Sequence, residues 1–185
     1  GRKVWTIKGK LPSATSNNST VIVSTNPSSW SGVTGAVSGN TISITNGKFA
    51  MNTMTFKSAA MKIALSSTPA AQNIVGGGQG VHFANLQLDA TQSGEDVRIS
   101  AVPVIMTVTT MTVGELTSCQ VFDGATALNT GGNVVALAAS GSATTYTFDN
   151  TLTIAKGTLK TLALKCNVAS TVSNGDLAQV SISTA

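Results

Sequence analysis

The chain has 185 residues and a formal net charge of +4, with 10% of its residues charged and 42% apolar. It is too apolar for a disordered chain, which combines low hydrophobicity with high charge. It also lacks the clustered Lys and Arg of a nucleic-acid binder. A single His argues against most classes of enzyme. No apolar run approaches the ~18 residues that a transmembrane helix requires.

Residues 1–58 carry short predicted strands separated by polar loops. Val, Ile and Thr favour strands, whereas Gly, Asn, Ser and Asp mark turns. The patterns predict strands at Val4–Ile7, Thr20–Ser24, Thr41–Thr45 and Phe49–Phe56. The last two would pair as a hairpin through Asn46-Gly47, a strong turn signal. This segment forms either extra strands of one sandwich or an arm that donates a strand.

From residue 59 the alternation of apolar and polar residues becomes more regular. Strands are predicted at 61–65, 81–88, Val97–Thr110, Leu116–Phe122, Val134–Ala138, Thr144–Ile154, Leu159–Val168 and Leu177–Ile182. Turn residues separate them at roughly 8–12-residue spacing, which is typical of an all-β antiparallel sandwich. We therefore place a domain boundary near Ser58 and assign residues 59–185 to the sandwich.

Several short motifs after Ala59 resemble an immunoglobulin-like β-sandwich module of prokaryotic cell-surface proteins, such as surface-layer proteins, adhesins and extracellular filaments. The motifs are Ser67-Thr68-Pro69, Val75-Gly76-Gly77, Phe83–Leu88, Gly94-Glu95-Asp96-Val97, Tyr146-Thr147-Phe148, Leu152-Thr153-Ile154 and Gly157–Val168. The resemblance implies an immunoglobulin-like sandwich at the cell surface with a mechanical or adhesive role, since a fold alone does not give a function.

Cys119 and Cys166 are the two cysteines of the chain. Strand alternation points both into the core, on strands that could face one another across the sandwich. A disulfide would close a long loop and stabilise the fold by roughly 4 kcal/mol. The alternative is a pair of buried free thiols, which are common in protein cores.

Three carboxylates, Asp89, Glu95 and Asp96, lie close together in a predicted turn region. Calcium prefers such oxygen-rich loops, so they form a weak calcium candidate and the sole cofactor that the sequence suggests. The competing interpretation is that each Asp bonds the backbone of its own turn. His82 and the Gly-rich segment 76–80 have no accompanying catalytic or phosphate-binding signature, and we expect no enzymatic activity.

Four of the positive charges, Arg2, Lys3, Lys8 and Lys10, lie in the first ten residues around the predicted strand Val4–Ile7. This stretch either pairs within its own chain or adds a strand to the sheet edge of a neighbouring subunit. In the second case Arg2, Lys3, Val4, Trp5 and Ile7 form an assembly arm. Trp5 and Trp30 offer a third possibility, as platforms for sugar stacking.

Asn17 and Asn18 begin two overlapping N-x-S/T glycosylation sequons in a polar loop. If the loop is glycosylated it must be exposed.

Low charge and many hydroxyl side chains suit a surface that is covered by copies of itself, because little charge has to be desolvated. The sequence therefore predicts a structural subunit of an extracellular filament or surface layer. Its partners would be copies of itself, with no nucleic acid and no transmembrane segment. An adhesin or carbohydrate-binding module that contacts a glycan or cell surface is the alternative.

Overall fold

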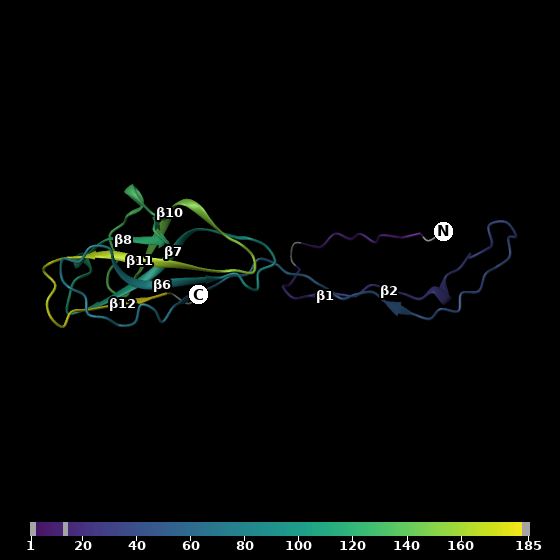
Figure 1. Ribbon diagram of the computed structural model, residues 1–185, viewed down its shortest axis with the longest axis horizontal. Coiled ribbons are helices and arrows are strands. Elements are labelled where there is room, and N and C mark those ends of the chain that lie inside the picture. The colour runs from purple at the N-terminus through teal and green to yellow at the C-terminus, as the bar shows by residue number, and fades with distance from the viewer. Residues whose placement is uncertain (1–2, 13–14, 183–185) are drawn as a thin grey trace. The chain divides into compact units, whose positions relative to one another are not determined.

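The computed structural model describes residues 3–12 and 15–182 (Figure 1). The chain divides into two compact units, unit 1 from Gly1 to Ser58 and unit 2 from Ala59 to Ala185. The fold is all-β, and its only helical elements among the described residues are three 3-10 turns at Pro27–Ser29, Val113–Glu115 and Gly131–Asn133. The described part of the chain has no helix that is long and apolar enough to cross a membrane.

Unit 1 contains an irregular two-stranded antiparallel ribbon. Each side of the ribbon is interrupted, so it contains four short strands: β1 (Thr20–Val21), β2 (Ser24–Thr25), β3 (Phe49–Ala50) and β4 (Met54–Thr55). β1 pairs with β4, and β2 pairs with β3. An isolated bridge from Thr34 to Thr41 extends the ladder towards the turn that reverses the chain. Among the described residues of the unit only Pro27 is buried, so the ribbon has no core of its own.

Two predictions for unit 1 are wrong. Residues 49–55 pair with 20–25 rather than with Thr41–Thr45, and the chain reverses near Gly35–Asn40 rather than at Asn46-Gly47. The Asn-Gly signal is local, whereas the observed ladder joins segments that are farther apart in the sequence. Val4–Ile7 is also not a strand, because no segment pairs with it among the described residues.

Unit 2 is a sandwich of two antiparallel sheets, in agreement with the predicted fold class. The five-stranded sheet has the order β5-β6-β11-β8-β9, and the three-stranded sheet has the order β10-β7-β12. The strands are β5 (Lys62–Leu65), β6 (Val81–Asp89), β7 (Val97–Thr109), β8 (Leu116–Asp123), β9 (Thr126–Ala127), β10 (Ala143–Ile154), β11 (Leu159–Val168) and β12 (Leu177–Ser181). Figure 1 shows β11 and β6 running together through this unit.

The core lies between the two sheets and follows from period-2 alternation. On β11 every second side chain, Leu162, Leu164 and Cys166, is fully buried. The three-stranded sheet contributes Val102 and Val104 from β7 and Tyr146 from β10. Burial raises the pKa of Tyr146 to about 12. These inward side chains explain why the long strands of unit 2 could be recognised from sequence.

The hairpin predicted at Asp123-Gly124 is formed. β8 and β9 pair through Phe122 with Ala127 and Asp123 with Thr126. Gly124 has φ +61°, a left-handed conformation that side chains with a Cβ rarely adopt. The strand predicted at Val134–Ala138 is absent, since these residues form a loop that follows the 3-10 turn at Gly131–Asn133.

Candidate functional site

The first described residues, 3–11, form an extended segment that we call the N-terminal arm. The arm makes no hydrogen bond to another described residue. Its apolar side chains are unusually exposed: Val4 and Trp5 are each 80% exposed and Ile7 is 68% exposed. Arg2, which was predicted to belong to the assembly arm, lies outside the described residues. The arm is therefore a strand-like segment whose backbone donors and acceptors have no partner among residues 3–12 and 15–182.

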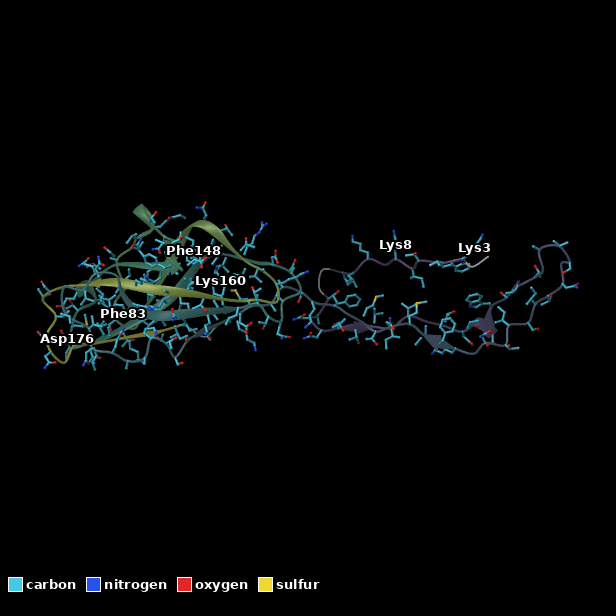
Figure 2. The ribbon with its side chains drawn as sticks, in the orientation of Figure 1. Lys3, Lys8, Phe83, Phe148, Lys160 and Asp176 are labelled. Carbon is cyan, nitrogen blue, oxygen red and sulfur yellow. A yellow bond between two sulfur atoms is a disulfide. The ribbon has the colours of Figure 1, made fainter. Side chains whose placement is uncertain are left out.

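The sequence of the arm has the period-2 pattern of a strand that buries one face. In an extended conformation Trp5, Ile7 and Leu11 share one side, and Thr6 and Lys8 lie on the other. From Trp5 to Leu11 one side is consequently apolar and the other carries polar and charged groups, whereas Lys3 and Val4 depart from this pattern. Figure 2 labels Lys3 and Lys8 on this segment.

Trp5 and Trp30 stack in unit 1, with ring centroids 6.2 Å apart and planes 1° from parallel. The indole N–H of Trp30 also donates a hydrogen bond to Thr25 Oγ1 at 3.2 Å. Half of Trp30 remains exposed. The pair thus presents aromatic surface to solvent rather than forming a buried core.

Charge is divided unevenly between the two units. Unit 1 has six Lys and Arg residues and no Asp or Glu, which gives it a formal charge of +6. Unit 2 has five Lys and Arg residues and all seven acids of the chain, which gives it −2. The low net charge of the whole chain conceals this difference between the units. Counting the charged residues on each side of Ser58 would have shown it from the sequence alone.

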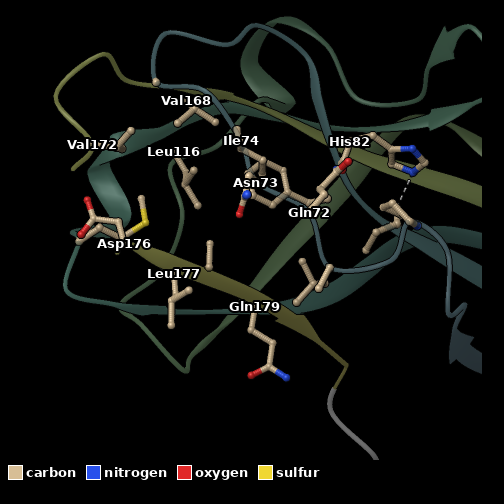
Figure 3. A pocket seen from close by; sticks show the side chains of 18 of the residues that line it. Gln72, Asn73, Ile74, His82, Leu116, Val168, Val172, Asp176, Leu177 and Gln179 are labelled. Carbon is tan, nitrogen blue, oxygen red and sulfur yellow. Dashed lines mark hydrogen bonds between the residues drawn. The ribbon is translucent and has the colours of Figure 1, made fainter. Parts of the chain in front are cut away.

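Unit 2 has an open groove beside β12, which we call the β12 groove (Figure 3). Its volume is about 730 Å³. The walls come from the loop that follows β5, the start of β6, and the segment that leads into β12. Apolar side chains from the core reach the groove, and they include Ile74, Phe83, Leu116, Val172 and Val180.

β12 is an edge strand that pairs only with β7 in the described part of the chain. Ala178 and Val180 pack against the core, whereas Leu177 and Gln179 on the alternate positions are exposed. The groove therefore combines apolar side chains with a strand edge that no other described strand pairs with. Its lining includes one acidic residue, Asp176, and no Lys or Arg.

Cys119 and Cys166 form a disulfide between β8 and β11, with their Cα atoms 4.1 Å apart. These strands are neighbours in the same sheet, so the bond does not cross the sandwich as the alternation suggested. Both residues are at most 1% exposed. The bond joins strands that are already paired and lies on the core side of the five-stranded sheet.

The predicted calcium ligands are not brought together. Asp89 accepts hydrogen bonds from the Thr91 hydroxyl and backbone N–H, and these bonds lower the pKa of Asp89. Asp96 instead accepts from the N–H of Lys156, and Glu95 shares its surface hollow with Arg98 and Lys156. Among the described residues no group of three or more His, Cys, Asp or Glu side chains could hold a metal ion.

His82 and the sequon residues have structural partners. The Nε2–H of His82 donates to Asn85 Oδ1 at 2.9 Å and to Ala84 O at 3.2 Å, so the ring is turned back onto β6 at the groove wall. Asn17 accepts a hydrogen bond from the Ser58 N–H, and Asn18 is exposed in a turn with φ +67°.

The β12 groove was missed by sequence reasoning because its walls come from segments far apart in the chain. The segments lie between Leu65 and Gly76, between His82 and Ala84, and between Val168 and Val180. No protein-family model matches this chain, nor does any curated protein or solved structure.

Proposed function

We propose that this protein is a structural subunit of an extracellular filament or surface layer and assembles from copies of itself through β-strand and sheet-edge contacts. The observation that carries the proposal is the exposed apolar surface of unit 1. Of the seventeen large apolar side chains that are exposed in the described chain, twelve belong to this smaller unit. A two-stranded ribbon is at best marginally stable in water by itself, so a surface of this kind is stabilised by a partner.

The chemistry of the ribbon favours burial against another copy. Removing apolar surface from water contributes roughly 25 cal/mol per Å². Phe49, Met51 and Met54 on the ribbon are each about half exposed, and no acidic side chain accompanies them in unit 1. The residues between them are uncharged, and their side chains cost far less to cover than charges. The positive unit 1 of one copy also attracts the negative unit 2 of the next.

The strand order of unit 2 supports an immunoglobulin-like module. In such a sandwich the first, second, fifth and fourth strands form one sheet, and the third strand pairs with the sixth in the other. β5-β6-β11-β8 matches the first set, and β7-β12 matches the second. β9 and β10 are then additions at the edges. This order fits the resemblance to cell-surface modules that the sequence motifs suggest.

The disulfide supports an extracellular location. Disulfides persist in oxidising compartments and are rare in the cytosol. Cys119–Cys166 accounts for both cysteines of the chain, so no free thiol is left to oxidise between copies.

Deleting Gly1–Lys10 tests the role of the arm in assembly. The full-length protein should form assemblies that are visible by electron microscopy, and the deletion should abolish them. Unit 2 should keep its fold because the arm is not part of its sheets, which circular dichroism would verify. As a matched control, Lys8→Gln and Lys10→Gln together remove charge but keep the apolar side and should still assemble. Intact filaments from the deletion variant would refute a role for the arm.

A carbohydrate-binding module is the second candidate, and the exposed Trp5–Trp30 stack favours it. Indole rings offer flat apolar faces to sugar rings, with a polar N–H at the edge. On this proposal Trp30→Ala abolishes binding on a glycan array while the protein stays monomeric by light scattering. Phe49→Ala, which also removes an exposed aromatic side chain from unit 1, serves as the control.

A further inference from the structure

We propose that the β12 groove accepts the N-terminal arm of a second copy, which adds a strand beside β12 and completes the sandwich. This inference rests on the proposed function and names the two surfaces that meet. It begins from the backbone: β12 has an unpaired edge, and the arm has donors and acceptors with no partner among the described residues. Strand addition satisfies both sets of groups at once.

The position beside β12 is where an immunoglobulin-like sandwich has its seventh strand, next to the sixth. In the described part of the chain no strand occupies that position. The core is open there: Phe83, Ile74 and Val172 reach the groove from the opposite wall and from the loop that precedes β12. An added strand would cover these side chains.

The side-chain pattern of the arm matches what the groove requires. An added strand directs alternate residues inward. Trp5, Ile7 and Leu11 would enter the groove beside Ala178 and Val180 of β12, and Thr6 and Lys8 would stay on the outer face with Gln179. The Trp5–Trp30 stack would be exchanged for burial in the groove, and it leaves Trp5 80% exposed at present.

Charge favours the same pairing. The arm contains Lys3, Lys8 and Lys10 and no acid. The groove contains Asp176 and no cationic Lys or Arg (Figure 3). Opposite charges on an arm and its groove raise the association rate and help to set the register.

The other sheet edges are poorer acceptors. β9 has two residues and β5 has four, so each offers a short ladder. The edge of β10 is partly covered, because the Asp149 N–H donates to Leu128 O at 2.7 Å and the Ala138 N–H donates to Thr144 Oγ1 at 2.8 Å. β12 is the edge that adjoins the groove, into which apolar side chains of the core reach.

The contact is heterologous, since the arm of one copy meets the groove of another. Such a contact continues from subunit to subunit unless the rotation closes a ring. Strand addition at β12 therefore explains how a single kind of interface could generate a filament.

Cysteine cross-linking between two full-length variants tests the pairing. One variant carries Thr6→Cys or Lys8→Cys in the arm, and the other, with a different affinity tag, carries Gln179→Cys. Under a mild oxidant at least one arm variant should form a dimer that contains both tags, which shows that the link joins two molecules. Thr147→Cys on β10 is the matched control, because it is exposed on the opposite edge of the same sheet. Equal linking to Thr147→Cys, or none to Gln179→Cys while assembly persists, would overturn the proposal.

A pair of charge substitutions tests which side of the arm enters the groove. Ile7→Asp places a carboxylate on the inward side and should weaken association by at least about tenfold. Thr6→Asp makes the same charge change one residue away on the outward side and should weaken it far less. Neither position is packed in unit 2, so the sandwich should fold in both variants. Equal loss in the two variants would overturn insertion at the groove. The proposed function itself would fail only if the unmodified chain does not self-associate.

Discussion

Removal of the Cys119–Cys166 disulfide should destabilise unit 2 by an amount that can be worked from its place in the chain. The bond joins residues 47 positions apart. Closing a loop of that length lowers the entropy of the unfolded chain. The bond therefore stabilises the folded state by about 4 kcal/mol. For a domain of the size of unit 2, that loss should lower Tm by about 15 °C. Thermal unfolding followed by circular dichroism, with and without reductant, would measure it.

The pattern across variants distinguishes a bond from two independent thiols. Cys119→Ala, Cys166→Ala and the double variant should each lose about the same stability, because one substitution already breaks the bond. Independent buried residues would instead give losses that add within about 0.5 kcal/mol. Additive losses, together with an unfolding curve that does not respond to reductant, would refute the disulfide and the extracellular location that it supports.

Three further predictions concern the sandwich. Burial raises the pKa of Tyr146, the single Tyr of the chain, to about 12. Its contribution to stability is therefore present below about pH 10 and is lost as the pH rises through 12. Ultraviolet absorbance of tyrosinate that appears near pH 10 in the folded protein would contradict this. In denaturant titrations Gly124→Ala should lower the free energy of unfolding by about 1 kcal/mol, because φ is +61° at the β8–β9 turn. Gly132→Ala should lower it little, since Gly132 has no positive φ and open space around it. Leu164→Ala, at a fully buried site, should lower the free energy of unfolding by about 2–5 kcal/mol. Leu159→Ala on the same strand, where the side chain is half exposed, should lower it by less than about 0.5 kcal/mol. Similar losses at the two sites would refute the assignment of which side of β11 faces the core.

The strands of unit 2 were predictable because each long strand buries one face. The alternation of Leu162, Leu164, Cys166 and Val168 leaves one register in which all four are buried. Unit 1 lacks this constraint. With only Pro27 buried among its described residues, burial does not select a register. The Asn46-Gly47 turn signal was therefore outweighed by pairing between segments farther apart in the sequence.

The two halves of the candidate site differ in the same way. The arm was recognisable because its charges and apolar residues are contiguous in the sequence. The β12 groove was not, because it depends on β12 being an edge strand and on Phe83, Leu116 and Val172 meeting there. Edge position is a property of sheet order, which alternation within a single strand does not encode. The strand order also made the two cysteine-bearing strands neighbours in one sheet.

Self-association of the unmodified chain is the central claim, and sedimentation velocity over a range of protein concentrations tests it most directly. We expect the weight-average sedimentation coefficient to rise with concentration and to fall back when salt screens the attraction between the +6 and −2 units. Electron microscopy of the concentrated sample should then show filaments or sheets. A single monomeric species at every concentration, up to the millimolar range, would contradict the account.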